Sequence, residues 1–476
     1  MSQNTIQTEL AVIGAGPGGY AAAFMAADLG LQVVLIDPSP HPGGVCLYRG
    51  CIPSKTFLHA ARVIHEAAAS QKWGVTFSKP AIDIDKLRNW KDTVVAKLTE
   101  GLGQLSSKRK ITYIQGRAQF ENPQQLSIQT QAGDALLCEF KHAVIATGSR
   151  PVKPTGLWED SPHILDSRLA LELADIPQNL LIIGGGYIGL ELGTVYATLG
   201  SRVTVAELTA GLLPGVDKDL VTVLKRRLGQ LFAEITVNTR VHGMQPKQNG
   251  VEVTLSGSEQ DEKPRLFEKI LVAVGRQPYT EKIGLDNAGV RLDANGFIQV
   301  DIHCRTSAPH IFAIGDVAGE PMLAHKASHQ GKIAVESLLG EKVAFEPNAI
   351  PAVVFTDPEI AWAGLTEKDA RENSIEHRVV RFPWSASGRA VALDRTDGLT
   401  KLILEPATNR ILGIGIVGFG ASEMIAEGVI AIEMGANATD LKLSIHPHPT
   451  MTETVMEAAD LVFNTATHYY RPRRNK

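Results

Sequence analysis

The chain has 476 residues, a length that predicts roughly three domains of ~150 residues each. Its 47 basic and 51 acidic residues leave a net charge of -4 with both signs mixed, so the composition does not favour a nucleic-acid partner. No apolar run reaches the ~18 residues of a membrane span, and four cysteines in this length do not make a secreted disulfide framework.

The first predicted elements form a dinucleotide-binding unit. An apolar strand over residues 9–13 runs into a glycine-rich turn, and an Ala-rich helix follows over residues 20–29. The turn has the spacing Gly-x-Gly-x-x-Gly, carried by Gly14, Gly16 and Gly19. Glycines let the backbone approach a pyrophosphate, and the helix N-terminus supplies amide donors. A second strand over residues 32–36 ends in Asp37, an acid suited to hold a ribose hydroxyl.

Two cysteines with four residues between them, Cys46 and Cys51, run into the first turns of a predicted helix. A helix N-terminus favours negative charge and can lower the pKa of a thiol from about 8.5. Buried structural cysteines and half of a metal site are the other interpretations. A zinc site needs further Cys or His at short spacing, and none follows nearby, so no metal is expected. The glycine-rich turn upstream favours a redox-active pair.

The same dinucleotide-binding unit occurs again. A strand over residues 180–183 leads into the turn formed by Gly184, Gly186 and Gly189, and a strand over residues 202–206 ends at Glu207. In both copies, 23 positions separate the first glycine from the acid. The repeat predicts two dinucleotides, a flavin beside the cysteines and a nicotinamide dinucleotide on the second unit.

Near the C-terminus, a histidine and an acid stand at a spacing that suits general base catalysis. Glu453, five positions after His448, can accept from one ring nitrogen and orient the other as a base. A lone His before Pro is more often a turn residue. His446 is expected to pack or hydrogen-bond locally.

Other polar and reactive residues carry simpler expectations. Cys138 and Cys304 are expected to be ordinary buried or strand cysteines, and Asp357 and Glu359 to be solvated in a turn. Residues 1–8 do not have the Arg-rich, acid-poor pattern of a transit peptide. A cytoplasmic location is expected, where a disulfide is usually catalytic.

From about Glu9 to Ala459 the chain resembles the dihydrolipoyl dehydrogenases, class I pyridine nucleotide-disulfide oxidoreductases that reoxidise protein-bound dihydrolipoamide with NAD. Besides the cysteine segment and the two turns, the motifs that carry the resemblance lie at residues 146–148, 274–276, 311–316 and 446–453. The resemblance implies an α/β fold with two Rossmann-like dinucleotide-binding domains plus a C-terminal α+β dimer interface domain. It also implies FAD and NAD as cofactors, and a homodimer that serves a lipoylated carrier protein or a 2-oxoacid dehydrogenase complex.

The resemblance also implies residue roles. Cys46 would be the exchange sulfur, Cys51 would lie against the flavin, and His448 would be the base of a site shared across the dimer. Lys55 and Glu191 would form an ion pair beside the flavin, although spacing alone favours a solvated Lys55. The implied FAD site includes Gly14, Gly16, Gly19, Asp37, Lys55, Thr147, Gly148, Asp316 and Ala324. The implied NAD site includes Gly184, Gly186, Gly189, Glu191, Glu207 and Gly275.

The expected domain organisation is interrupted. Residues 1–149 are expected to form the first part of the FAD-binding domain and residues 150–272 the NAD-binding domain, closing with a hairpin around residues 257–264. The chain then returns to the flavin over residues 273–346, and residues 347–476 form the dimerisation domain.

Related enzymes of the same fold are weaker alternatives. Glutathione reductase lacks the His-x-His form seen at His446, and it prefers NADP, whose 2'-phosphate Glu207 would repel. Mercuric reductase and the larger thioredoxin reductases carry further cysteines near the C-terminus, and none follows Cys304. A non-catalytic flavin-binding subunit is disfavoured by the intact cysteine pair, His448 and Glu453.

One departure from the family lies between the two cysteines, where Tyr48 and Arg49 replace the usual Asn-Val. A cation within about 4–6 Å of a thiolate favours its ionised form. Arg49 is therefore expected either to lower the pKa of an active-site thiol or to meet an acidic patch on the lipoyl carrier. The third interpretation is that it extends into solvent.

Overall fold

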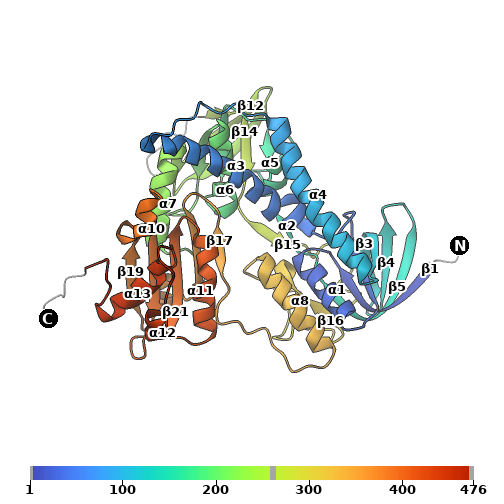
Figure 1. Ribbon diagram of the computed structural model, residues 1–476. Coiled ribbons are helices and arrows are strands. Elements are labelled where there is room, and N and C mark those ends of the chain that lie inside the picture. The colour runs from blue at the N-terminus through green and yellow to red at the C-terminus, as the bar shows by residue number, and fades with distance from the viewer. Residues whose placement is uncertain (1–3, 258–263, 471–476) are drawn as a thin grey trace.

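The computed structural model describes residues 4–257 and 264–470. Its helices pack on three main sheets, and each sheet belongs to a different part of the molecule (Figure 1). The first two parts combine parallel strands with helices, and the third is built on an antiparallel sheet. The expected fold class is confirmed.

The first sheet has the strand order β1-β2-β3-β4-β5-β16 with an additional β1–β5 pairing. Its strands are β1 (Asn4–Ile13), β2 (Val33–Asp37), β3 (Thr112–Asn122), β4 (Gln125–Thr130), β5 (Ala135–Ile145) and β16 (Ile311–Ala313). The pairing is parallel except at β4, which is antiparallel to β3 and β5. Strand β16 follows the whole second sheet in the sequence, so the chain leaves this part and returns to it.

Helices α1 (Pro17–Asp28) and α8 (Ala324–Leu338) lie side by side on this sheet although they are far apart in the sequence (Figure 1). Their close approach depends on Gly331, where a Cβ would lie 2.7 Å from the carbonyl oxygen of Gly18. The other helices of this part are α2 (Gly44–Arg49), α3 (Cys51–Ala69), η1 (Ser70–Trp73), α4 (Ile84–Lys108) and η2 (Gly315–Ala318).

The second sheet is parallel, with the order β10-β9-β8-β14-β7. Its elements are β7 (Ile164–Leu165), α5 (Ser167–Glu172), β8 (Asn179–Ile183), α6 (Tyr187–Leu199), β9 (Arg202–Ala206), α7 (Lys218–Leu231), β10 (Glu234–Thr236) and β14 (Lys269–Val272). A small antiparallel sheet joins β11 (Arg240–Lys247), β12 (Gly250–Ser256) and β13 (Arg265–Phe267). The predicted hairpin is therefore β12–β13, and most of its turn lies outside the described residues.

Two short antiparallel strands, β6 (Ser149–Pro151) and β15 (Arg276–Pro278), mark where the chain enters and leaves the second part. The third sheet is antiparallel, with the order β17-β18-β21-β20-β19. Its elements are β17 (Ala352–Val354), β18 (Glu359–Gly364), α9 (Glu367–Glu372), β19 (Arg378–Pro383), η3 (Trp384–Ala386), α10 (Gly388–Ala392), β20 (Leu399–Leu404), β21 (Ile411–Gly418), α11 (Ala421–Glu433), α12 (Ala438–Leu443) and α13 (Glu453–Phe463).

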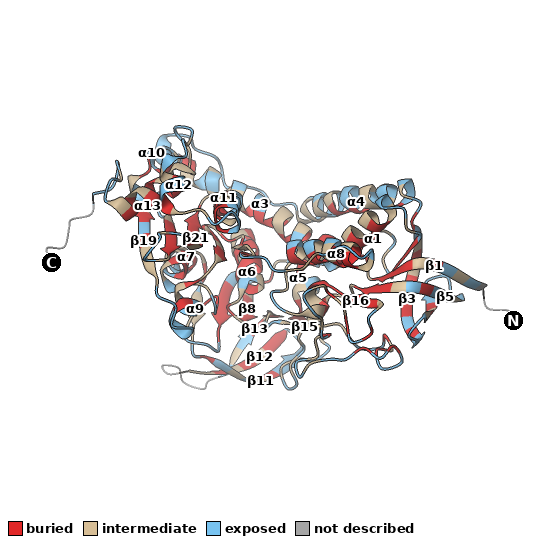
Figure 2. Ribbon diagram, turned by 90° about the horizontal axis from the view of Figure 1, so that it is seen from below, coloured by how far each residue is buried: buried red, intermediate tan, exposed pale blue. Residues whose placement is uncertain are grey.

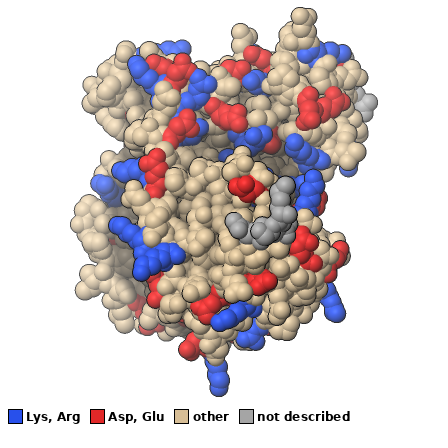
Figure 3. Space-filling view, turned by 90° about the vertical axis from the view of Figure 1, so that its right-hand side faces the viewer, with Lys and Arg blue, Asp and Glu red and all other residues tan. Residues whose placement is uncertain are grey.

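The three parts share buried surface. Phe57 and Leu58 of α3 pack into the same apolar cluster as the second part, together with Ile360 and Val417 of the third. Figure 2 shows buried residues concentrated in the strands, whereas much of α4 is exposed. Figure 3 shows basic and acidic side chains intermixed over one face. Among the described residues, no helix is long and apolar enough to cross a membrane.

Candidate active site

The first glycine-rich turn joins β1 to α1 and is formed by backbone contacts that exclude side chains. Gly14 has a φ of 97°, and a Cβ there would lie 2.4 Å from the carbonyl oxygen of Ala146. A Cβ at Gly19 would lie 1.8 Å from the carbonyl oxygen of Gly14. Helix α1 begins at Pro17 without a side-chain cap, so its first N–H groups face the turn. This arrangement is suited to an anionic group such as a phosphate.

Asp37 holds this turn from the end of β2. Its Oδ2 accepts a hydrogen bond from the Ala15 N–H at 2.8 Å, and its Oδ1 accepts one from the Ser39 N–H at 2.8 Å. A carboxylate has about four acceptor positions, so two remain for a sugar hydroxyl. The side chain is buried at the edge of a cavity that the turn also lines.

Cys46 lies on the short helix α2, and Cys51 is the first residue of α3, with Gly50 between the two helices. Helix α2 packs closely against the first glycine-rich turn, because a Cβ at Gly44 would lie 2.4 Å from the Cα of Gly16. Both cysteines are free thiols here and are hydrogen-bonded to each other. That bond lowers the pKa of Cys51 to about 7, with further lowering by the charge of Lys55, and it raises the pKa of Cys46.

Lys55 and Glu191 form an ion pair, with 2.8 Å between Nζ and Oε2. The expectation from spacing, a solvated Lys55, is wrong. Glu191 is 3% exposed, and its Oε1 accepts a hydrogen bond from the Phe355 N–H at 3.0 Å. The ammonium of Lys55 also lies 4.4 Å from the ring centre of Phe355. The pair therefore joins α3, α6 and the third part next to Cys51.

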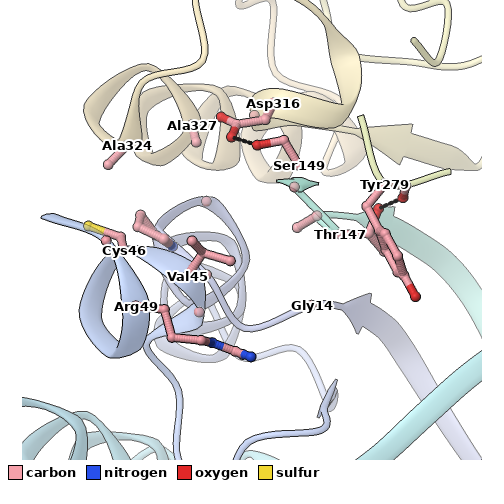
Figure 4. Close-up of a pocket in the computed structure, with 18 of the residues that line it drawn as sticks. Gly14, Val45, Cys46, Arg49, Thr147, Ser149, Tyr279, Asp316, Ala324 and Ala327 are labelled. Atoms are coloured by element: carbon pink, nitrogen blue, oxygen red, sulfur yellow. Dashed lines mark hydrogen bonds between the residues drawn. The ribbon is translucent and has the colours of Figure 1, made fainter. Parts of the chain in front are cut away.

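These groups surround one cavity of about 640 Å³ (Figure 4). The sequence-predicted residues that line it are Gly14, Gly16, Asp37, Cys46, Cys51, Lys55, Thr147, Gly148, Glu191, Asp316 and Ala324. Asp316 accepts a hydrogen bond from the Ser149 hydroxyl, and Thr147 donates one to the Tyr279 carbonyl at 2.7 Å. Ala324 begins α8, whose N-terminus has no side-chain cap.

The second glycine-rich turn repeats the geometry of the first. Gly184 has a φ of 107°, and a Cβ there would lie 2.4 Å from the carbonyl oxygen of Ala273. A Cβ at Gly189 would lie 2.5 Å from the carbonyl oxygen of Gly184. Gly186 precedes α6, which carries Tyr187 and, one turn later, Glu191 into the cavity lining. Helix α6 thus connects this turn with the first site.

His448 and Glu453 are paired but lie outside the cavity lining. His448 Nδ1 is 2.9 Å from Glu453 Oε1, and Glu453 Oε2 accepts a hydrogen bond from the Thr450 N–H at 2.8 Å. Burial raises the pKa of Glu453, but these hydrogen bonds outweigh it and the net shift is downward. The His448 side chain is 74% exposed. His446 bonds locally to Glu427 and Ser444, as expected.

Comparison with known proteins places this geometry in a family. Residues 8–331 match the pyridine nucleotide-disulphide oxidoreductase family, and residues 350–459 match its dimerisation domain. The chain belongs to the pyridine nucleotide-disulphide oxidoreductase family. The dihydrolipoyl dehydrogenases of Buchnera aphidicola (subspecies Schizaphis graminum) and Vibrio cholerae are 46% and 44% identical to it, each over 97% of both chains. The expected family is confirmed.

Solved structures agree with this assignment. LpdA from Mycobacterium tuberculosis superposes with a TM-score of 0.89 at 27% identity, over 96% of this chain and 99% of its own. The HOCl-induced flavoprotein disulfide reductase RclA from Escherichia coli gives a TM-score of 0.84 at 29% identity, over 95% and 100%. The family implies FAD and NAD as cofactors, as the sequence predicted.

The residues of this chain fit those cofactors. The turns at Gly14 and Gly184 leave no room for side chains, so the backbone can approach a pyrophosphate closely. An acid stands at the end of the next strand after each turn. The cavity is within the usual size range of cofactor sites, about 300–1,000 Å³, and runs from Asp37 to the cysteine pair.

Sequence reasoning assigned no site role to two polar residues of this cavity, Ser149 and Arg276. Arg276 donates from Nε to the Ser149 hydroxyl at 2.8 Å and also bonds the Ser149 carbonyl, which fixes the side chain that contacts Asp316. Their positions in the sequence could have indicated them, because Ser149 directly follows the predicted site residues Thr147 and Gly148, and Arg276 directly follows Gly275.

The expectation for Asp357 and Glu359 needs correction, and the structure bears on the alternatives for Arg49. Asp357 is mostly buried and is bonded by Arg395, and Glu359 accepts from the Ser422 N–H at 3.0 Å, so neither acid is simply solvated. Arg49 is not among the groups that act most on either thiol pKa. It is exposed, and in Figure 4 its side chain extends away from the Cys46 sulfur. These observations favour the interpretation in which Arg49 extends into solvent over the one in which it lowers the pKa of a thiol.

Proposed function

We propose that the protein is a dihydrolipoyl dehydrogenase, which oxidises protein-bound dihydrolipoamide to lipoamide and reduces NAD to NADH. The observation that carries the proposal is the Cys46–Cys51 pair beside the Lys55–Glu191 ion pair in one cavity. The near full-length identity of 44–46% to proteins named dihydrolipoyl dehydrogenase supports the substrate class.

The proposed reaction begins with the Cys46–Cys51 disulfide. A dihydrolipoyl thiolate attacks Cys46 Sγ, a mixed disulfide forms, and Cys51 leaves as a thiolate. The second lipoyl thiol then attacks the lipoyl sulfur of the mixed disulfide, which releases lipoamide and leaves both cysteines reduced. A low thiol pKa favours a leaving group, so the lowered pKa of Cys51 supports these unequal roles. Bound FAD supplies the two-electron acceptor between the dithiol and NAD.

His448 is the proposed base for the lipoyl thiol. Its Nδ1 faces Glu453, and no described residue bonds its Nε2, which can therefore take the proton. The exposure of His448 and the dimerisation domain match at residues 350–459 support a homodimer in which His448 serves the partner's disulfide.

The proposed cofactor sites follow the two glycine-rich turns. FAD is assigned to the first turn, Asp37, Lys55, Thr147, Gly148, Asp316 and the N-terminus of α8 at Ala324. NAD is assigned to the second turn, Glu191, Glu207 and Gly275. The course of the chain through β6 and β15 supports the proposed boundaries after residues 149 and 272, and the dimerisation domain match from residue 350 supports a last domain over 347–476.

The proposed partner is a lipoylated carrier protein or a 2-oxoacid dehydrogenase complex. A reducing compartment is the setting in which a catalytic disulfide cycles, and the cytoplasm is proposed for that reason.

An activity assay tests the proposal directly. Purified protein with bound FAD is mixed with dihydrolipoamide and NAD, and NADH formation is followed by absorbance. Activity in the wild type and its loss in Cys46→Ser are the expected results. A preference for glutathione disulfide with NADPH, or the absence of dihydrolipoamide oxidation by the FAD-loaded protein, would overturn the proposal.

A further inference from the structure

Glu207, at the end of β9, is held by three hydrogen-bond donors. Its Oε2 accepts from the Gly185 N–H at 2.6 Å. Its Oε1 accepts from both the backbone N–H and the hydroxyl of Thr209, each at 2.7 Å. Glu207 is buried, whereas Thr209 is exposed on the loop that follows. One residue therefore supplies two of the three bonds.

These bonds fix the direction of the carboxylate. Two of the donors are backbone groups that any residue at the same positions provides, but the third is the Thr209 hydroxyl. Bonds to an ionised acceptor are about twice as strong as neutral ones. Rotation of the Glu207 side chain would break all three bonds. The Thr209 hydroxyl therefore helps to hold the carboxylate in this orientation.

The carboxylate retains room for a ligand. Three of about four acceptor positions are filled by protein donors. The Thr209 Oγ also lies 2.9 Å from the carbonyl oxygen of Gly211, but its single hydrogen favours the nearer, ionised Glu207 Oε1. Oε1 already accepts two bonds, so the open position is on Oε2, and a sugar hydroxyl can donate there while the Thr209 hydroxyl keeps its bond to Oε1.

We propose that Thr209 is a positioning residue for the nicotinamide dinucleotide: its hydroxyl holds Glu207 toward the adenosine ribose and so strengthens the choice of NAD over NADP. The inference rests on the proposed function for the assignment of Glu207 to that ribose. NADP carries a phosphate in place of the 2'-hydroxyl, so it gains nothing from an oriented acceptor.

The test compares Thr209→Val, which removes the hydroxyl at nearly constant shape, with Thr209→Ser, which keeps it. Dissociation constants of the FAD-loaded protein for NADH and NADPH are measured by fluorescence titration. We expect NADH to bind about fivefold to tenfold more weakly to the Val variant, and within about twofold of wild type to the Ser variant. The dissociation constant for NADPH should stay unchanged, so the selectivity for NADH over NADPH falls by the same factor.

A double-mutant cycle separates positioning from a general structural effect. In a Glu207→Ala background, Thr209→Val should cause no further loss of NADH affinity. The inference is overturned if the Val variant binds NADH as tightly as wild type, if Ser fails to rescue, or if the loss persists without Glu207. NADH binding needs no lipoyl substrate, so a failure of dihydrolipoamide oxidation in the wild type would refute the proposed function and leave this test intact.

Discussion

Cys46 and Cys51 carry the same thiol in different surroundings. Cys51 stands at the N-terminus of α3 with the charge of Lys55 nearby, and Cys46 donates a hydrogen bond to it. All three effects favour a thiolate at Cys51, whereas at Cys46 the hydrogen bond and burial outweigh the charge of Lys55 and raise the pKa. The inequality gives the proposed exchange reaction its direction, because the more acidic sulfur is the better leaving group.

Single replacements of the cysteines should separate their roles. Cys46→Ser should leave Cys51 as a thiolate against oxidised FAD, with a long-wavelength charge-transfer band in the visible spectrum. Cys51→Ser should lack that band, because the remaining sulfur is the one assigned to the substrate. Absorbance spectra of the two FAD-loaded variants check this, and reversed spectra would contradict the assignment. Both variants should lose dihydrolipoamide oxidation.

The band of the reduced, dithiol enzyme should depend on pH. The pKa of Cys51 is lowered to about 7, so the thiolate, and with it the band, should be lost as pH falls through about 7. Lys55→Met removes a charge that lowers this pKa, so the midpoint of its charge-transfer titration should lie at higher pH than in wild type. Arg49→Val is the matched control, and its midpoint should remain that of wild type. An equal upward shift in both variants would contradict the role given to Lys55.

At the scale of elements, a buried cluster of charges joins the second and third parts of the molecule. Lys401 on β20 is 1% exposed, and its Nζ lies 2.6 Å from Asp217, 2.8 Å from Asp219 and 3.1 Å from Glu367. These three acids stand at the start of α7 and in α9. Their oxygens are close enough to bind a cation; the ammonium of Lys401 lies within reach of all three, and Arg381 also pairs with Asp219 and Glu367.

Lys401→Met should destabilise the protein by about 3–5 kcal/mol, because it leaves three acids without their buried partner. The free energy of unfolding from denaturant titration measures this, with the exposed Lys108→Met as control.

Burial raises the pKa of Asp219, but Lys401 and Arg381 outweigh it and hold the net value below 3.8. A carboxyl group whose pKa is lowered on folding stabilises the folded state at pH values above its unfolded pKa. That stabilisation is lost as the pH falls through the folded pKa. The difference in the free energy of unfolding between wild type and variant should therefore shrink below about pH 4. A difference that stays constant with pH would contradict this account.

The sequence predicted those elements whose signals are local. The expected helix over residues 20–29 is α1, which begins earlier because Pro17 is well suited to a first helical turn. The two glycine-rich turns were predicted because only glycine fits their backbone contacts. Contacts between distant segments were not predictable in this way. Lys55 and Glu191 are 136 positions apart, so their pairing was implied by the family resemblance alone. Thr209 is identified as a site residue only by its bonds to Glu207.

At the scale of the whole molecule, the proposed base and the disulfide belong to different parts. Cys46 lines the cavity, whereas His448 lies outside its lining on the part that matches the dimerisation domain. His448 is paired with Glu453 and is largely exposed in the single chain. A base that has no contact with the sulfur of its own chain requires a second copy to act, so we expect each site to use two subunits.

Co-expression of Cys46→Ser and His448→Ala subunits should therefore restore activity that neither variant has alone. In such a mixed dimer, one site combines the intact Cys46 of the His448→Ala subunit with the intact His448 of the other. The second site has neither group, so a purified mixed dimer should reach about half of the wild-type rate when the sites act independently. Separate affinity tags on the two subunits isolate the mixed species, and dihydrolipoamide oxidation is measured with both homodimers as controls. Inactive mixed dimers, formed from subunits that fold and bind FAD as homodimers, would show that His448 does not act on the partner's disulfide.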